Sequence, residues 1–431
     1  MKSAGKTAAL GLQHVLAMYA GAVIVPLIVG QAIGLTSAQL TYLVAIDIMM
    51  CGVATILQIM NNRFFGIGLP VVLGCTFTAV GPMIQIGNDY GISAIYGAII
   101  VSGLFVIAIS KYFGKLVRFF PPVVTGTVVT IIGVTLIPVA FNDVGGGVGA
   151  SDFGAPVNLA LAFGTLFLII LIYRFANGFF KAVSILIGLL TGTFVAILLG
   201  MVDFTPVKEA SFVHMAQPFY FGAPTFEWPA ILTMTLVAMV SLVESTGVYF
   251  ALGDICEKEL DDKDLAKGYR AEGIAVVLGG IFNSLPYTTF SQNVGLVQMS
   301  GVKSRKIILV TGLMLVTLGF VPKIAALTTI IPKPVLGGAM IAMFGMVVAQ
   351  GVKMLGKTFM TSEANSMIIA CSVGIGLGVT VAPDLFVNLP KSMQMFTSNG
   401  IVAGSLTAIL LNIIFNMLGK GTRQVPTSTN Q

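Results

Sequence analysis

The sequence predicts an all-α, polytopic membrane protein with about fourteen transmembrane segments in two inverted repeats of seven. Three observations support this fold class: an apolar composition, an uneven distribution of basic residues and an internal repeat. Of the 431 residues, 56% are hydrophobic and 9% are charged, whereas soluble domains usually contain about 25% charged residues. The largest charged stretch, 254–270, is too short to fold alone. We therefore expect a single membrane domain over residues 1–431.

Polar residues and Gly/Pro breaks divide the chain into apolar spans. The first span follows a basic start and lacks a small-residue cleavage site, which favours a retained helix over a cleaved signal peptide. We place the spans near 9–29, 38–60, 65–84, 90–110, 114–141, 157–174, 178–200, 228–250, 268–288, 289–300, 305–321, 324–351, 365–383 and 399–419.

The net charge of +6 could indicate a nucleic-acid partner, but the positions of the basic residues argue against one. If the N-terminus is cytoplasmic, only four of the 23 basic residues fall on the outer side: Lys208, Lys323, Lys333 and Lys391. A wrong number of spans would scramble this asymmetry. The positive-inside rule therefore favours an even number of spans, with both termini in the cytoplasm.

Two stretches 212 residues apart share a pattern of Pro, Val and Gly. PVVTGTVVTIIG (122–133) and PVLGGAMIAMFG (334–345) both read P-V-x-x-G-x6-G. At nearly the same offset, the Thr-Phe-Thr at 76–78 corresponds to the Thr-Phe-Ser at 289–291. Because seven crossings reverse the chain direction, a repeat after seven spans has inverted topology.

The third and tenth spans are unusually short or interrupted. GLPVVLGCTFTAVGP (68–82) and LPYTTFSQNVGLVQMSG (285–301) carry β-favouring Thr and Phe between Gly and Pro residues. Irregular backbone at membrane depth is tolerated only where protein or a watery cavity surrounds it. Broken segments at matching positions of two inverted repeats, about 9–200 and 228–419, indicate a secondary transporter with its site near the midplane. The alternative is that both are ordinary loop ends.

Polar side chains inside the spans are the candidate ligands, because a charge at the bilayer centre costs about 2.5–3.5 kcal/mol. Glu244, in the eighth span, can accept two hydrogen bonds from adjacent N–H groups of a ligand, or it can form an internal pair. Gln292 offers both a donor and an acceptor to a ligand edge, or it can cap a helix. Its neighbour Asn293 points in a different direction, so we expect it to hold the surrounding helices.

Three further polar residues have a structural or solvated interpretation beside the functional one. Glu272 opens the ninth span, where an interfacial carboxylate is commonly just solvated. His14, in the first span, is a packing residue or a candidate proton relay. For the buried Asp47 we favour a structural role.

The sequence offers little for metal binding or catalysis. The four cysteines are far apart and form no CxxC or Cys/His cluster, so we expect no metal site and no disulfide scaffold. A membrane enzyme would need metal ligands or a nucleophile–base pair at the midplane, and the two histidines, His14 and His214, lie far apart. We therefore expect that the protein is not an enzyme.

At these residues the chain closely resembles the nucleobase–ascorbate transporter family, also called the second nucleobase–cation symporter family, over essentially its whole length. The family signature, Q/E-N-x-G-x4-T/S and then a small or basic residue, is matched by QNVG at 292–295 and SG at 300–301. Ser300 replaces the usual Thr and Val294 a frequent Asn, and neither change removes a needed hydrogen-bonding group. Further matches are Gln13-His14, Thr76-Phe77, Glu244 and Arg270-Ala271-Glu272-Gly273.

The resemblance implies a core domain that holds the substrate, at about 9–110 and 228–321, and a gate domain at about 114–200 and 324–419. It also implies that the protein is often a homodimer. By resemblance, Glu244 and Gln292 bind the base through their side chains, and Phe77 contributes backbone and ring contacts. The residues that would tune affinity and proton coupling are Glu272, Asn293 and His14.

The resemblance also narrows the substrate. Gln at the first signature position is typical of carriers of oxidised purines, whereas uracil carriers tend to have Glu. The surrounding segment is similar to bacterial xanthine and urate permeases. Thr76, the fourth residue that we expect to bind the substrate, occupies a position that varies between the two. Xanthine has N–H groups beside carbonyls, so a carboxylate and a glutamine can pair with its edges while an aromatic ring stacks on its face.

The sequence therefore predicts a symporter that imports xanthine across the cytoplasmic membrane of a bacterium, with a proton as coupling ion and no cofactor. Its expected partners are the purine, the lipid bilayer and a second copy, with no nucleic acid. A uric acid permease is the nearest alternative, followed by a uracil permease or an anion carrier of the same fold. Against the anion carrier, no basic residue lies securely inside a span beside the broken segments. A channel is disfavoured by the inverted repeat and the single buried site.

Overall fold

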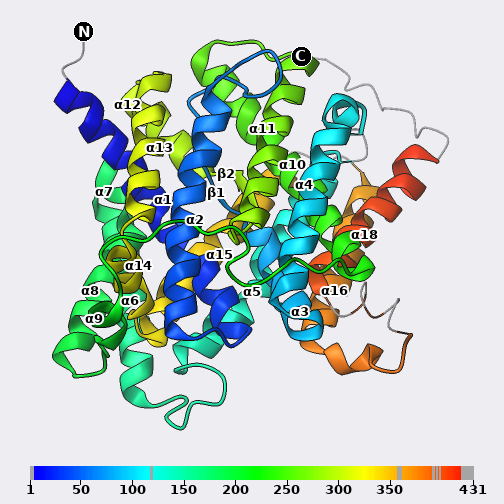
Figure 1. Cartoon of the computed structure of the whole chain (residues 1–431). Helices are drawn as coiled ribbons and strands as arrows, with labels where there is room; N and C mark the ends of the chain where they lie inside the picture. Colours follow the sequence, from blue (N-terminus) through cyan, green and yellow to red (C-terminus); the bar gives the residue numbers. More distant parts are fainter. Residues whose placement is uncertain are drawn as a thin grey trace, which may run out of the picture.

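The computed structural model describes residues 4–116, 120–356, 362–390, 394, 397 and 399–418, which are almost entirely helical (Figure 1). The first half comprises α1 (Ala4–Ala32), α2 (Ser37–Ile59), β1 (Leu73–Cys75), the 3₁₀ turn η1 (Phe77–Ala79), α3 (Val80–Tyr90), α4 (Ile92–Leu116), α5 (Pro122–Val144), α6 (Pro156–Phe175), α7 (Phe179–Ala182), α8 (Ser184–Leu198) and α9 (Thr205–Glu209). The second half comprises α10 (Trp228–Cys256), α11 (Asp262–Ile281), β2 (Tyr287–Thr289), α12 (Ser291–Ser300), α13 (Arg305–Gly319), α14 (Pro322–Thr329), α15 (Lys333–Leu355), α16 (Glu363–Val381), η4 (Pro383–Phe386), α18 (Gly400–Asn412) and the π-helical turn η5 (Ile413–Met417).

The membrane segments agree with the predicted number. Within the described ranges, nine helices are long and apolar enough to cross a membrane. The bent pair α13–α14, the shorter apolar helix α8, helix α11 and the two broken segments β1–α3 and β2–α12 bring the number to fourteen. Lys391, residues 117–119 of the fifth predicted span and residue 419 of the last lie outside the described residues.

Several predicted boundaries are wrong, including that between the fourth and fifth spans, because α4 continues to Leu116 and α5 begins only at Pro122. The span predicted at 324–351 is two helices, because α14 bends by 80° from α13 and ends at Thr329, and α15 begins only at Lys333. Pro332 and Pro334 lack the N–H groups that would continue a helix across this break. The span predicted at 268–288 already ends at Ile281, shortly before Asn283 adopts a left-handed conformation (φ 61°).

The two halves are related by an approximate two-fold symmetry that is visible in the contacts between elements. Helix α2 packs on α13 as α11 packs on α4, and α6 packs on α15 as α16 packs on α5. Helices α5 and α15, which contain the two stretches related by the predicted offset of 212 residues, pack on each other. These symmetry-related contacts between helices confirm the inverted repeat.

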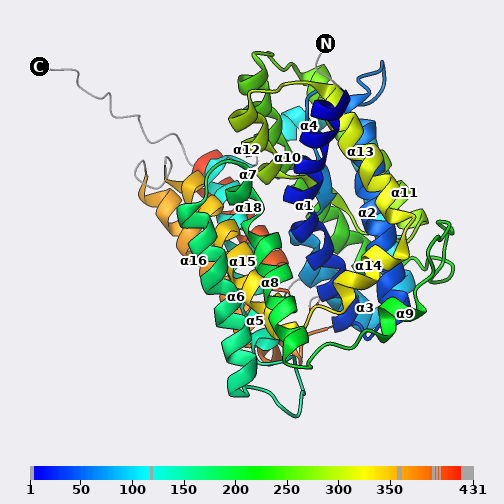
Figure 2. The same cartoon turned by 90° about the vertical axis from the view of Figure 1, so that its left-hand side faces the viewer.

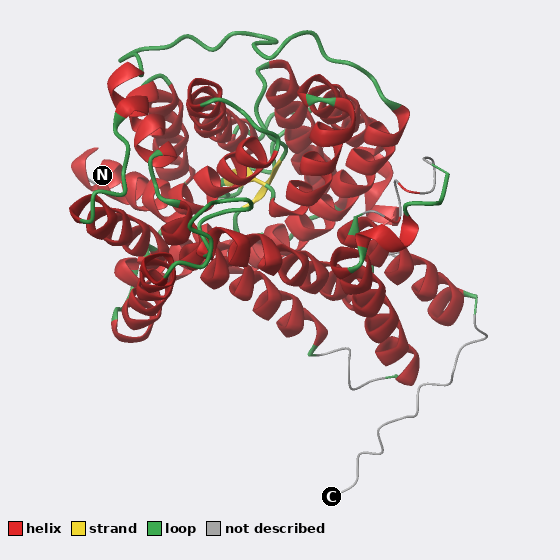
Figure 3. Cartoon of the chain, turned by 90° about the horizontal axis from the view of Figure 1, so that it is seen from below, coloured by secondary structure: helices red, strands yellow, loops and turns green. Residues whose placement is uncertain are grey.

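The two short strands lie at the centre of this symmetry, enclosed by helices (Figure 3). They pair antiparallel, with Leu73 opposite Thr289 and Cys75 opposite Tyr287. The backbone N–H of Thr76 donates to the carbonyl of Pro286, and that of Phe290 donates to Val72, both at 2.9 Å. Each broken segment thus satisfies the backbone of the other where water is scarce, which is why a strand pair is tolerated at membrane depth.

Close packing of one aromatic ring fixes the strand pair in place. The Phe290 ring lies against the backbone of Gly21 in α1 and of Gly74 in β1, where a Cβ atom would overlap it. Thr55 in α2 accepts a hydrogen bond from the Leu73 N–H at 3.0 Å. The strands are therefore positioned by α1 and α2 as well as by each other.

The helices form two bodies that lie side by side (Figure 2). One contains α6, α15 and α16, and the other contains α2, α11 and α13. Helix α10 and the broken segments belong to the second body, and they bring their polar side chains to the side that faces α15.

Candidate functional site

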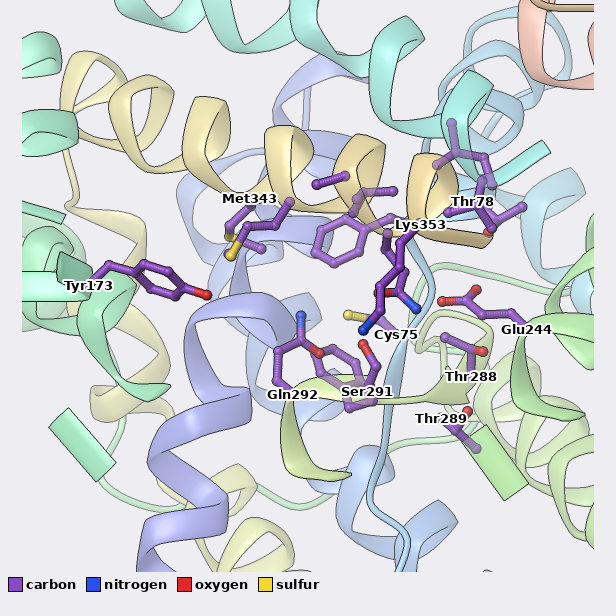
Figure 4. A pocket seen from close by; sticks show the side chains of 18 residues that line it. Cys75, Thr78, Tyr173, Glu244, Thr288, Thr289, Ser291, Gln292, Met343 and Lys353 are labelled. Carbon is purple, nitrogen blue, oxygen red and sulfur yellow. The ribbon is translucent and has the colours of Figure 1, made fainter. Parts of the chain in front are cut away.

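The broken segments border a cavity of about 400 Å³ between α10 and α12 on one side and α5, α6 and α15 on the other (Figure 4). Its lining mixes apolar and polar side chains, as is usual for small-molecule sites. The first body contributes Val129, Ile132, Tyr173, Met343, Met346, Val347, Ala349, Gln350 and Lys353, and the second contributes Cys75, Phe77, Thr78, Glu244, Thr288, Thr289, Phe290, Ser291 and Gln292.

Glu244 and Gln292 both point into this cavity, from α10 and from the first turn of α12 (Figure 4). Glu244 is half-buried, and Gln292 is exposed to the cavity. Neither side chain has a hydrogen bond or an ion pair with another described residue. The two predicted ligands therefore face one space with their polar atoms free to bind.

Phe77 lines the same cavity, and its ring is oriented by an edge-on contact with Phe344 of α15, with the centroids 5.9 Å apart and the planes at 86°. Thr76, the fourth predicted ligand, is buried and does not line the cavity. Its hydroxyl accepts a hydrogen bond from the Thr78 N–H at 3.2 Å and lies 3.4 Å from the Ser241 hydroxyl. In this conformation Thr76 caps the turn that presents Phe77.

Glu272 is buried behind the strands, where it is 2% exposed rather than solvated. Its carboxylate accepts hydrogen bonds from the Ser245 hydroxyl at 3.1 Å and from the Tyr249 hydroxyl. The Ser245 hydroxyl lies 3.2 Å from that of Thr288, which lines the cavity. A chain of hydroxyl groups therefore connects the buried carboxylate of Glu272 with the cavity.

His14 and Asn293 are brought together, but away from the cavity. The Asn293 amide lies 3.1 Å from the His14 Nδ1 and donates to the His14 carbonyl at 3.1 Å, and both side chains are buried. This pair fastens α12 to α1, next to Gln292. The predicted bracing role of Asn293 matches this geometry.

Asp47 braces the second broken segment from α2. Its carboxylate is fully buried and accepts hydrogen bonds from the Ser284 hydroxyl at 2.8 Å and from the Leu285 N–H at 3.2 Å. The partners of Asp47 thus belong to the turn that leads into β2, and the residue has the structural position that we expected.

Among the cavity-lining residues that sequence reasoning missed are the three polar ones of the first body: Tyr173 of α6 and Gln350 and Lys353 of α15. We expected no basic residue securely inside a span beside the broken segments; Lys353, in the last turn of α15 and beyond the span predicted at 324–351, nevertheless reaches into the cavity that they border (Figure 4). From the sequence, Lys353 was predicted only to be one of the basic residues on the cytoplasmic side. The signal was the spacing of Met343, Met346, Gln350 and Lys353, which places them on one face of a helix.

The cavity offers acceptors, donors, one cation and an aromatic ring, so it suits a small, planar, polar molecule. No group of three His, Cys, Asp or Glu side chains within the described ranges is placed to hold a metal ion. Fourteen segments in an inverted repeat, with broken strands at a polar cavity between two bodies, define a secondary transporter rather than an enzyme.

Comparisons with known proteins make the assignment more specific. The permease family model Xan_ur_permease matches residues 5–385. The chain is 64% identical to a xanthine permease of Bacillus subtilis (strain 168) over 97% of this chain and 96% of that protein. It is 59% identical to the uric acid permease PucK of the same strain, over 97% of both chains. The chain therefore belongs to this permease family, the nucleobase–ascorbate transporters that its motifs indicate.

A solved structure shares the fold. The transmembrane domain of the cyanobacterium bicarbonate transporter BicA superposes with a TM-score of 0.64 at 15% identity, covering 94% of this chain and 96% of that one. At this identity the likeness concerns the fold alone. The inverted-repeat architecture of a multi-pass membrane transporter is thus confirmed.

Proposed function

We propose that the protein imports xanthine by proton symport across the cytoplasmic membrane, with uric acid as the alternative substrate. The observation that carries this proposal is the unpartnered pair Glu244 and Gln292, which face one cavity beside Phe77. Relatives named for xanthine and for uric acid support the oxidised purine class. Between these two purines the relatives do not discriminate, so the substrate has to be measured.

The polar groups of the cavity complement an oxidised purine. The Glu244 carboxylate would accept hydrogen bonds from ring N–H groups, and the Gln292 amide would pair with an edge that presents N–H beside C=O. The Phe77 ring would pack on the purine. A base that lacks a matching group would leave buried polar atoms unpaired, at a cost of about 1–3 kcal/mol each.

Proton coupling would use Glu244 and Glu272, the two acidic residues near the strands. Glu272 is connected to the cavity through the hydroxyl groups of Ser245 and Thr288, so a proton could move between the carboxylate and the substrate site along this chain. A charge that crosses 100 mV releases about 2.3 kcal/mol, which corresponds to roughly fiftyfold accumulation. Protonation would precede purine binding, and deprotonation inside would release the purine.

Alternating access would move the two bodies relative to each other. In this proposal the core comprises about 9–110 and 228–321 and the gate about 114–200 and 324–419. Helix α14 would move with the core, because it packs on α2, α9 and α13. Both termini would be cytoplasmic, and the protein would act as a homodimer.

The proposal is tested by uptake of radiolabelled xanthine into cells that lack their own purine permeases. Unlabelled xanthine, urate, uracil, hypoxanthine, guanine and bicarbonate serve as competitors. We expect saturable uptake that xanthine or urate blocks and that Gln292→Ala abolishes. Gln298→Ala, in the same helix but not lining the cavity, is the matched control and should retain uptake. If well-expressed protein takes up no base, the nucleobase assignment is overturned. If bicarbonate inhibits uptake and none of the unlabelled bases does, an anion carrier is favoured.

A further inference from the structure

Lys353 is the one cation among the described residues that line the central cavity. It lies in the last turn of α15, in the body opposite Glu244 and Gln292, and its side chain extends toward the middle of the cavity (Figure 4). No carboxylate in the described part of the chain lies within ion-pair distance of Lys353; the three ion pairs there involve Lys258, Lys267 and Lys303. Among the described residues, therefore, no ion pair neutralises the positive charge of Lys353.

The surroundings of Lys353 favour an anionic ligand over a neutral one. The other ionisable groups that line the cavity are Glu244 from α10, Tyr173 from α6 and Cys75 from β1, and Lys181 lies over the Tyr173 ring at 4.4 Å. When Glu244 carries a proton, Lys353 is the only formal charge among the described residues of the lining. An anion that binds then pairs with Lys353, and no negative charge opposes it.

We propose that Lys353 is a specificity-determining residue that recognises negative charge on the purine, so that the site prefers anionic to neutral oxidised purines. This inference rests on the proposed function and deepens it. Urate is the stronger acid of the two candidates and is an anion at neutral pH, whereas xanthine is mostly neutral and ionises only as the solution becomes alkaline. Lys353 therefore ranks urate above neutral xanthine.

The same arrangement explains how one cavity accommodates a carboxylate and an anionic substrate. A proton on Glu244 removes the repulsion between two negative charges, and Lys353 holds the purine anion from the opposite body. With an anionic purine, the proton and the anion then cross together as a neutral pair, whereas neutral xanthine crosses with the net positive charge of the proton. Because the ligand contacts Glu244 in one body and Lys353 in the other, its binding also draws the two bodies together.

The test compares Lys353→Met, Lys353→Gln and Lys353→Arg with Val352→Ala, a change at an exposed position of the same helix that does not line the cavity. Each variant is assayed for the concentration of unlabelled urate or xanthine that halves uptake of labelled xanthine, at pH 6 and at pH 8. We expect Lys353→Met and Lys353→Gln to weaken urate about tenfold to a hundredfold, and xanthine at pH 6 less than about threefold. Lys353→Arg and Val352→Ala should stay within about threefold of the unaltered protein.

The pH dependence provides a second readout. In Lys353→Met the affinity for xanthine should fall between pH 6 and pH 8, as xanthine ionises, whereas that for hypoxanthine should not. Urate should raise the melting temperature of the purified unaltered protein and not that of Lys353→Met, which reports binding even if the variant transports poorly. Equal losses for urate and for neutral xanthine, or no loss, would overturn the role of Lys353. Absence of purine uptake by the unaltered protein would instead overturn the proposed function.

Discussion

At the scale of single residues, hydrogen bonding separates the polar groups that hold the fold from those that are free to bind. Glu272, Asn293 and Asp47 are buried and held by neighbouring side chains and backbone. Glu244 and Gln292 face the cavity and have no such partners among the described residues. Because their polar atoms face the cavity and are not used by the described part of the fold, Glu244 and Gln292 are available to pair with a ligand.

Glu244→Gln should weaken the binding of neutral xanthine about tenfold or more, because the amide replaces the charged acceptor that this purine would meet with a group that also donates. Glu244→Asp keeps the carboxylate on a shorter side chain and should lose less. Competition between labelled and unlabelled xanthine on purified protein measures both. If Glu244→Gln binds xanthine as tightly as the unaltered protein does, Glu244 is not a ligand.

Ser245→Ala should uncouple transport from the proton gradient, because it interrupts the hydroxyl chain between Glu272 and Thr288. We expect xanthine exchange across the membrane to persist, while accumulation against a gradient falls. Ser241→Ala, on the same helix, is the control, since Ser241 lies beside Thr76 and outside this chain. Full accumulation by Ser245→Ala would show that protons take another route.

At the scale of elements, the strand pair is the feature on which the site depends. Phe77 follows shortly after the end of strand β1, and Gln292 follows shortly after the end of strand β2. The register of the two strands therefore sets how these two side chains face each other. The pair needs glycine at position 74, because the Phe290 ring occupies the place of a Cβ atom there.

Gly74→Ala should therefore abolish transport, and it should lower the melting temperature of the purified protein by displacing Phe290. Gly247→Ala, in α10 near Glu244, is the matched control. A Cβ at position 247 meets no atom within 4 Å, and alanine is the better helix former. If Gly74→Ala is as active as Gly247→Ala, the packing of Phe290 on β1 is not needed for the site.

At the scale of the whole molecule, the sequence predicts what depends on periodicity and composition. The 212-residue offset and the two Gly/Pro-rich segments led to the inverted repeat and the broken strands, because these are local features of each half. Lys353 could not be assigned in this way. Lys353 and Glu244 line the same cavity because of the way in which the two bodies meet. The sequence of a single span does not show how the bodies meet.

The burial of Glu272 was missed for a related reason. Its position near the start of a span indicates an interface, but its donors Ser245 and Tyr249 come from another helix. Their spacing of four residues puts both on one face of α10, which is a signal only once α10 and α11 are known to be neighbours. Helix packing, rather than sequence position, thus decides which carboxylates are buried.

The central claim is that this cavity couples purine entry to protons, and reconstituted vesicles test it most directly. Purified protein in liposomes is given an inward proton gradient, and uptake of labelled xanthine is followed with and without a protonophore. We predict accumulation that requires the gradient, that the protonophore abolishes and that Gln292→Ala loses while Gln298→Ala retains it. Xanthine uptake that is indifferent to the gradient, or equal in the two glutamine variants, would contradict the account.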